Sequence, residues 1–377
     1  MRIVKHVGLD VHAESISVAV ASAEGVLSQG RIPHDLVMLK KMLAKFGEPG
    51  SLRVVYEAGP TGLGLCRSLN EWGVQCAVIA PTLIPKQSGD RVKTDRRDAQ
   101  KLARLSFGGL LTDIYIPSDE QEALRDLVRA REAAKKNQTS VRNQLSKFLL
   151  RRNLKPDSKI KKWSAKYMPW VRSLKIKETA AQIALEEYIV EVEHQSERIK
   201  RIEARLIEVS ADLGVVLTAM IQALQGFKGI KFLTAVTFAS EIGNMMRFTT
   251  APELMSYAGV VPREYSSGGK VQKGSITKSG NAHLRRVLGE TAWSYSRGFS
   301  TPGATVKKRR EGLSPEIVQI LERADQRLRH RFIALEAKGK HRNKVITAVG
   351  REMLGFIWAV ARIAQQQVAK SKAAKEQ

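Results

Sequence analysis

The sequence predicts an α/β N-terminal domain, a long helical coiled-coil arm and a mainly α-helical C-terminal domain. Short apolar stretches alternate with helical patterns up to about residue 117, which is typical of an α/β layer fold. Glycine is then absent between Leu110 and Gly214, where charge is dense and apolar residues recur at helical spacing. Glycines return after that segment. We therefore expect domains at residues 1–117, 118–213 and 214–377.

The first domain is expected to alternate strands with helices. Asp10 lies in the first apolar strand, and Glu57 ends a later one. Thr94 is a suitable N-cap for the helix that follows it, because its hydroxyl can accept a hydrogen bond from a backbone amide. The predicted strands are 3–11, 15–22, 52–57 and 74–79, and the predicted helices are 35–46, 61–72 and 95–106.

The second part is expected to be helical and strongly charged. Apolar stripes over 124–149 and 183–209 predict two long helices that pair as a coiled-coil arm. Between them lies a basic insert, residues 155–177, which also carries Trp163, Tyr167 and Trp170. Two interpretations of this insert stay open: a loop packed by its aromatic residues, or a contact with nucleic acid.

The third part contains a glycine-rich turn and a polar loop. Residues 224–231 resemble a helix-hairpin-helix turn, whose exposed amides can receive a DNA phosphate. The stretch 266–281 has small residues and cations but almost no acids, as expected of a loop that approaches a phosphate backbone. Terminal helices follow over 313–368. The candidate nucleic-acid-binding residues here are Lys228, Lys270, Lys273, Lys278, Arg285 and Arg286.

The chain is strongly basic, with a formal net charge of +26 and a pI near 10.2. Such an excess predicts a polyanionic partner, most simply nucleic acid. A basic membrane-surface protein is the rival class, but no basic amphipathic helix, lipidation signal or apolar run of about eighteen residues stands out. Cys66 and Cys76 have no metal-ligand spacing. We expect no signal peptide and a place in the cytoplasm, associated with the nucleoid.

Four acidic residues predict a metal site. Asp10 is flanked by apolar residues, and an uncompensated acid in a buried strand costs several kcal/mol. Mg²⁺, with Mn²⁺ as a substitute, prefers such oxygen ligands. Asp95 and Asp98 lie three positions apart on a predicted helix and share a face. Taken singly, Asp95 could compensate the helix dipole and Glu57 could be a turn residue. Together the four are typical of an RNase H-like (RuvC-like) phosphoryl-transfer domain.

Sequence motifs extend over nearly the whole chain. The N-terminal half carries Gly8-Leu9-Asp10, Tyr56-Glu57-Ala58-Gly59 and Thr94-Asp95-Arg96-Arg97-Asp98-Ala99. The C-terminal half carries Gly226-Phe227-Lys228-Gly229-Ile230, Ser267-Gly268, Gly280-Asn281 and Leu284-Arg285-Arg286. With these motifs the chain resembles the DEDD transposases of insertion sequences, a family related to Piv-type DNA invertases and bridge-RNA-guided recombinases.

The resemblance implies an enzyme that cuts and rejoins DNA. It implies that the metal-binding acids of a RuvC-like domain are Asp10, Glu57, Asp95 and Asp98. It also implies that Ser267 in a C-terminal serine transposase domain is the covalent nucleophile, with Ser266 as the neighbouring alternative. The family further implies a structured guide RNA and a homo-oligomer, dimer or tetramer. The serine domain of one subunit would then complete the acid site of another.

Other classes of protein share part of this pattern. A RuvC-like DNA junction resolvase or nuclease without serine chemistry would explain the acids but leave Ser267 and the C-terminal domain without a role. An actin-like ATPase also has an Asp near Gly in its first strand, but a second glycine-rich phosphate loop is absent and the net charge weighs against it. A non-catalytic DNA-binding scaffold is the last alternative. A covalent protein–DNA adduct would distinguish the transposase from all of these.

Overall fold

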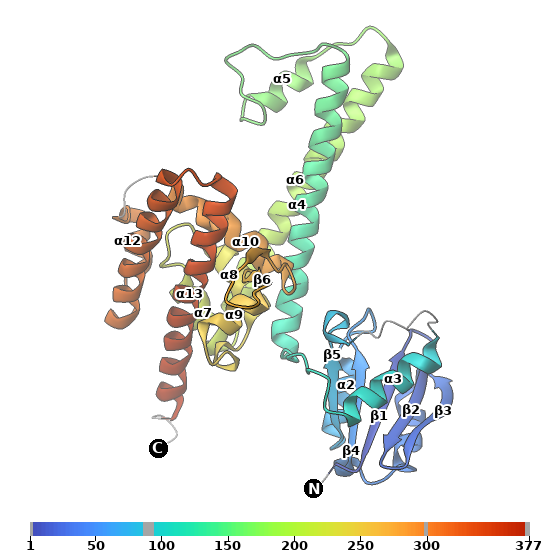
Figure 1. The fold of residues 1–377 in the computed structure, drawn as a ribbon. Coiled ribbons are helices and arrows are strands. Elements are labelled where there is room, and N and C mark those ends of the chain that lie inside the picture. Colours follow the sequence, from blue (N-terminus) through green and yellow to red (C-terminus); the bar gives the residue numbers. More distant parts are fainter. Residues whose placement is uncertain (1–2, 86–93, 298–300, 374–377) are drawn as a thin grey trace. The chain divides into compact units, whose positions relative to one another are not determined.

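The computed structural model describes residues 3–85, 94–297 and 301–373 (Figure 1). The chain forms two compact units, Met1–Pro117 and Ser118–Gln377. The first unit is mixed α/β, and the second is mostly helical. None of the described helices combines the length and the apolar character that a membrane crossing needs. The division of the second unit into an arm and a C-terminal domain stays a prediction.

The first unit is built on a five-stranded sheet with the order β3-β2-β1-β4-β5. β1 (Lys5–Val11), β2 (Ser15–Ser22) and β3 (Gly25–Pro33) form an antiparallel meander. β4 (Leu52–Glu57) is parallel to β1, and β5 (Gln75–Ile79) is parallel to β4. The sequence patterns predict all of these strands except β3. It is an edge strand with mostly exposed residues, so it lacks the apolar alternation of a half-buried strand.

Helices pack on both faces of this sheet. α1 (Leu36–Ala44) and α2 (Gly64–Glu71) cover one face, where their leucines pack against Val7 and Leu9 of β1. α3 (Asp95–Phe107) covers the other face, mainly through alanines that pack on alanines of β2. These small side chains let α3 lie close to the strands. Short 3-10 turns precede β4 and follow β5.

The second unit begins with two helices of 33 residues each, α4 (Asp119–Arg151) and α6 (Thr179–Ala211). They pack along each other, and we call this pair the arm (Figure 1). Short helix α5 (Tyr167–Ser173) lies in the connection between them and packs against α6. Both long helices lie where the apolar stripes predict them, whereas coiled-coil geometry stays a prediction. The buried residues along the pair include Leu124, Val128, Val141, Leu145, Val192, Ile199 and Leu206.

The remaining helices form one apolar core around α13 (Arg342–Ala373). α8 (Phe232–Ile242) packs against α4, so the arm is attached to this core. A two-stranded hairpin, β6 (Pro262–Glu264) and β7 (Lys273–Ile276), projects between α9 and α10. The other helices are α7 (Val215–Leu224), α9 (Ala251–Tyr257), α10 (Ala282–Ala292), α11 (Ala304–Arg310) and α12 (Pro315–Ala337).

Candidate active site

The acidic residues predicted to bind metal lie at the carboxyl ends of two strands and at the start of α3. Asp10 stands near the end of β1, and Glu57 ends the parallel neighbour β4. Asp95 and Asp98 stand in the first turn of α3. Residues far apart in the sequence therefore meet at one edge of the sheet.

Gly8 explains why α3 can lie against β1 beside Asp10. A β-carbon at Gly8 would lie 2.2 Å from the Ala99 carbonyl oxygen and 2.4 Å from the Ala103 backbone nitrogen. Only a residue without a side chain lets the two backbones approach this closely. Because successive strand residues point to opposite faces, Asp10 shares the face of Gly8, toward α3.

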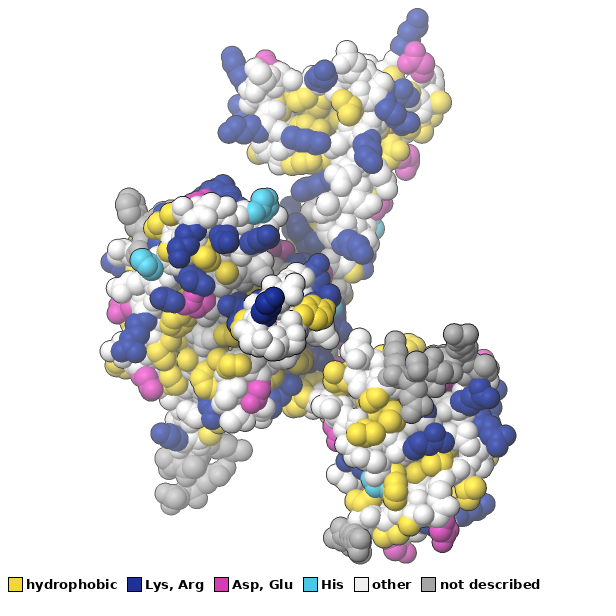
Figure 2. Space-filling model, in the orientation of Figure 1, with side chains coloured by type: hydrophobic (Ala, Val, Ile, Leu, Met, Phe, Trp, Pro, Cys, Tyr) yellow, Lys and Arg dark blue, Asp and Glu magenta, His cyan; other side chains and the backbone are white. Residues whose placement is uncertain are grey.

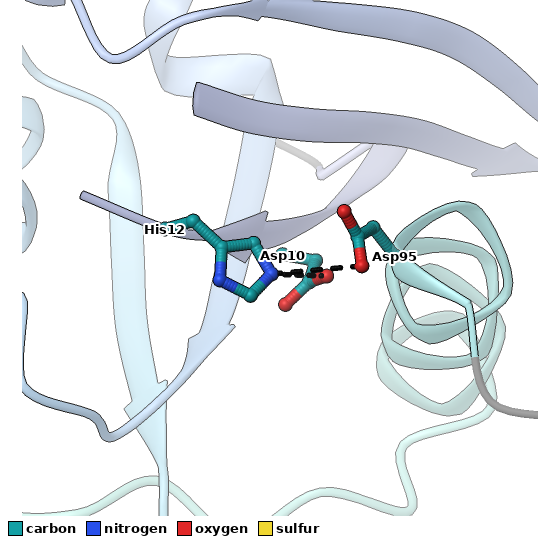
Figure 3. A group of neighbouring side chains, drawn as sticks. All are labelled: Asp10, His12 and Asp95. Atoms are coloured by element: carbon teal, nitrogen blue, oxygen red, sulfur yellow. Dashed lines mark hydrogen bonds and ion pairs between the residues drawn. The ribbon is translucent and has the colours of Figure 1, made fainter. Parts of the chain in front are cut away.

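The structure brings a histidine into the acid cluster. His12 Nε2 lies 3.2 Å from Asp10 Oδ2 and 3.7 Å from Asp95 Oδ1 (Figure 3). Ligand atoms of the three residues all lie within 4.8 Å of one another, so the group could hold a metal ion. The sequence interpretation missed His12. Its position two residues after Asp10 was the available signal, since residues i and i+2 of an extended chain point the same way.

Burial and neighbouring charges act together on Asp10. Partial burial raises the pKa of Asp10, the adjacent His12 lowers it, and the carboxylates of Asp95 and Asp98 raise it, with a net upward shift. A raised pKa means that the ionised carboxylate is incompletely compensated in this environment. A divalent cation fits such a site, because it would supply the missing positive charge.

Glu57 and Asp98 lie outside this close group. Glu57 is exposed, and the register of β1 with β4 places it beside Asp10 on the neighbouring strand. Asp98 is near enough to raise the pKa of Asp10. Within the described part of the chain, the compact ligand set is thus Asp10, His12 and Asp95, with the other two predicted acids next to it.

A shallow groove runs beside the acid cluster. Two arginines and several small hydroxyl side chains contribute to its walls, and such groups commonly contact phosphate oxygens. A nucleic-acid backbone in this groove would reach the acid cluster at Asp95. The lining residues are Ser17, Ser28, Gly30, Arg31, Thr94, Asp95 and Arg96.

The predicted serine loop is the tip of the β6–β7 hairpin. Ser267 pairs with Lys270 near the tip, and the backbone N–H of each donates to the carbonyl of the other at 3.3 and 3.1 Å. Gly268 and Gly269 make the turn with φ of +55° and +82°, the left-handed region that glycine adopts without strain. The local sequence therefore forms a tight turn with Ser267 immediately before it.

The two candidate serines differ in their hydrogen bonds. Ser266 Oγ donates to Glu264 Oε1 at 2.8 Å and accepts from the Gln272 backbone N–H at 3.2 Å. The Ser267 hydroxyl is exposed and makes no hydrogen bond to any residue that the structure describes. The hairpin therefore gives the two hydroxyls different surroundings: two partners hold that of Ser266, and that of Ser267 is exposed.

Comparison with known proteins matches both units of the chain. Residues 7–153 match the DEDD transposase model of IS110 elements, and residues 221–305 match the Transposase IS116/IS110/IS902 family. A putative transposase of Sinorhizobium fredii is 39% identical over 328 residues, covering 87% of this chain and 79% of the relative. The transposase of insertion sequence element IS1533 from Leptospira borgpetersenii is 31% identical over 340 residues, covering 89% and 97%.

This chain belongs to the IS110/IS116/IS902 transposase family. It is therefore a DNA transposase, an enzyme that cuts and rejoins DNA. Its DEDD domain is RNase H-like, and the acid cluster agrees with the use of a divalent metal. A pilin gene-inverting protein of Moraxella lacunata is also similar, with 27% identity over 306 residues, 78% of this chain and 76% of that protein.

A buried carboxylate joins the arm of this transposase to the start of α10, the helix that follows the serine hairpin. Glu241 of α8 is fully buried and accepts hydrogen bonds from Arg129 of α4 at 2.8 and 2.9 Å. It also accepts one at 2.7 Å from Asn281, the N-cap of α10 directly after the hairpin. Burial alone would raise the pKa of Glu241, but the hydrogen bonds from Arg129 and Asn281 hold it below its usual value. The arm, α8 and the start of α10 thus meet at one ionised group.

The predicted nucleic-acid-binding residues of the transposase fall into two groups. Lys228 and Arg285 donate to backbone carbonyls, and Arg286 forms ion pairs with Glu132 and Glu290. These three cations already have partners within the fold. The exposed residues, on the hairpin and the loop after it, are Lys270, Lys273 and Lys278. We therefore expect the hairpin lysines to carry more of the contact with DNA.

Proposed function

We propose that this transposase cuts and rejoins DNA by metal-dependent phosphoryl transfer through a covalent phosphoserine intermediate at Ser267. The observation that carries the proposal is the unengaged Ser267 hydroxyl at the tip of a cationic hairpin. Supporting it is the acid cluster around Asp10 in the same chain. A nuclease that used only the acids would have no need for the exposed serine.

The metal would be Mg²⁺, with Mn²⁺ as a substitute. Asp10, Asp95 and His12 present ligand atoms within one small volume, and Glu57 and Asp98 lie beside them. The raised pKa of Asp10 supports a cation at this position. The imidazole favours a somewhat softer ion than carboxylates alone do, so Mn²⁺ should bind well. When bound, the ion neutralises nonbridging phosphate oxygens and stabilises the leaving oxygen.

Ser267 would form the covalent link. Its Oγ attacks a DNA phosphorus, and an Oγ–P bond forms while the bond from phosphorus to a deoxyribose oxygen breaks. The departing oxygen takes up the proton that the serine loses. Attack by the hydroxyl of another strand reverses the step, so the bond energy is kept and no ATP is consumed. The exposed Lys270 and Lys273 offset the phosphate charge near the hairpin tip.

We also propose a guide RNA and a homo-oligomer, dimer or tetramer, acting in the cytoplasm at the nucleoid. The net charge of +26 suits an RNA in addition to DNA. Ile183 and Val190 of α6 are 54% and 59% exposed and lie one heptad apart, so pairing of arms from two subunits would cover them. Sequencing of RNA that co-purifies with the protein tests the guide.

A denaturing gel of labelled element-end DNA tests the serine chemistry. Wild type should give a covalent adduct that protease removes, and Ser267→Ala should bind DNA but give none. Ser266→Ala is the matched control, and it should retain adduct because it keeps the Ser267 hydroxyl. Strand cleavage by Ser267→Ala without an adduct would instead favour a RuvC-like nuclease or junction resolvase without serine chemistry.

A further inference from the structure

The far end of the arm carries a small folded module, residues 152–178, which we call the arm cap. Tyr167 and Val171 of α5 are buried there against apolar residues of α4 and α6, including Phe148 and Leu185. This cluster is separate from the large core of the C-terminal helices. The basic insert is thus an ordered cap with its own apolar centre.

The aromatic side chains of the arm cap pack against one another and against a cation of α4. The Trp163 and Tyr167 rings lie 4.9 Å apart, and the Tyr167 and Trp170 rings lie 5.4 Å apart. The Arg142 guanidinium sits over the Trp163 ring at 4.8 Å. Burial also raises the pKa of the Tyr167 hydroxyl. Rings occupied in this way are poor platforms for stacking unpaired bases, which is how single-stranded nucleic acid is usually held.

The cations of the arm cap region point outward. Ten Lys and Arg residues lie between Arg151 and Lys177, against one acid, Asp157. All ten are exposed. Arg172 pairs with Glu193, and Arg152 lies over the Phe148 ring. The other eight have no ion pair or ring contact with the described residues: Arg151, Lys155, Lys159, Lys161, Lys162, Lys166, Lys175 and Lys177. Figure 2 shows dark-blue side chains spread around this end of the arm.

We propose that the arm cap is a separate DNA site, which holds the phosphate backbone of duplex DNA without reading its sequence. Exposed lysines on a rigid support neutralise phosphates, whereas the rings of the arm cap pack on one another and are buried or only partly exposed, which disfavours stacking of bases on them. The site goes beyond the serine and acid chemistry and rests only on the fact that the chain is a DNA transposase.

The length of the arm determines how far from α10 the arm cap would contact DNA. Glu132 of α4 pairs with Arg286 of α10, so α4 is tied to the C-terminal helices there. From Glu132 to Arg151 the helix continues for about 28 Å at about 1.5 Å per residue. Along B-DNA this corresponds to about eight base pairs at 3.4 Å each. The arm cap can therefore hold DNA that lies well away from α10 and the hairpin that precedes it.

Binding of the full-length protein to a DNA duplex of about 30 base pairs, measured over a range of salt concentrations, tests the proposal. The cap variant carries four Lys→Gln changes at Lys159, Lys161, Lys162 and Lys166. The control variant carries the same charge change on the C-terminal helices and the turn joining them, at Lys338, Lys340, Lys344 and Lys370, which are also exposed. Unchanged circular dichroism and melting of both variants would confirm that they fold.

The cap variant should bind at least about tenfold more weakly near 0.1 M salt, and its slope of log K against log salt should flatten by up to about 3.6, at 0.9 per lost phosphate contact. The control should lose much less. Equal losses in the two variants, or none in the cap variant, would overturn the proposal. So would a loss confined to an RNA duplex of equal length, which would identify RNA as the partner. The assay measures binding and needs no strand cleavage, so it succeeds or fails independently of Ser267.

Discussion

Gly8→Ala should impair the transposase without removing any acidic residue. The new β-carbon would lie 2.2 Å from the Ala99 carbonyl oxygen and 2.4 Å from the Ala103 nitrogen, and both atoms belong to the backbone of α3. Carbon needs well over 3 Å from such atoms, so α3 must move away from β1 by about 1 Å. Overpacking of this kind typically costs about 1–3 kcal/mol of folding free energy.

The same displacement would carry Asp95 away from Asp10. A misplacement of about 1 Å can cost about 100-fold in rate, so we expect a loss of that order in adduct formation. Weaker Mn²⁺ binding, measured by calorimetry, should accompany it. Isothermal titration and adduct assays on the same preparation separate this effect from simple unfolding, which thermal melting would report.

Gly64→Ala is the matched control. Gly64 begins α2 in the same unit, and a β-carbon there would meet no atom within 4 Å. That variant should melt and react like wild type. Equal activity, metal affinity and melting temperature for Gly8→Ala and Gly64→Ala would refute the argument that close packing of α3 on β1 builds the acid site.

Four other perturbations test the remaining features. Asp10→Asn should lower strand exchange at least about 100-fold, since even changes around metal ligands cost 10- to 100-fold. The pKa of Asp10 is raised in the fold, so ionised Asp10 destabilises the metal-free protein at a pH above that pKa. Without metal at neutral pH, Asp10→Asn should therefore melt at a higher temperature than wild type. Glu241→Gln should destabilise the second unit by about 3 kcal/mol in urea, because it leaves partly buried arginines unpaired. Glu132→Gln breaks the partly exposed ion pair of Glu132 with Arg286, and it should lower the free energy of unfolding by about 1 kcal/mol or less. The pKa of Glu241 is lower in the folded protein than in the unfolded chain, where it is about 4.3. Wild type should therefore be more stable than Glu241→Gln above about pH 4.3, and this difference should disappear as the pH falls through the pKa of the folded state. Ile183→Glu with Val190→Glu should shift light scattering toward the monomer, and a monomeric wild type with and without nucleic acid would contradict arm pairing.

The salt bridge at Arg310 and Asp325 shows how the C-terminal core supports the glycine-rich turn. Both side chains are nearly buried, and Arg310 also donates to the Gly226 carbonyl at 3.0 Å. Arg309 donates to the Ile230 carbonyl at the other end of the turn. Carbonyls of the turn thus have cationic partners from α11. This arrangement fixes the turn, whose amides were expected to face a DNA phosphate.

Local pattern determined much of this protein in advance. Apolar alternation and spacing predict β1, β2, β4 and β5 and the two long arm helices, because burial of one face imposes a period on the sequence. The positions of the acids near strand ends and in a helix start also follow from sequence, since secondary structure alone places Asp10, Glu57 and Asp95. The edge strand β3 did not follow, because exposed positions carry no such period.

Tertiary structure decided the features that depend on distant residues. His12 joins Asp10 and Asp95 only because the loop after β1 and the start of α3 meet at one sheet edge. Ser267 differs from Ser266 only because the hairpin aligns Glu264 and Gln272 with the latter. The aromatic residues of the basic insert pack against one apolar cluster because α4, α5 and α6 meet there. Each of these three features depends on which residues lie within a few ångströms of one another. Such contacts join segments that are separate in the sequence, so the pattern of one segment cannot predict them.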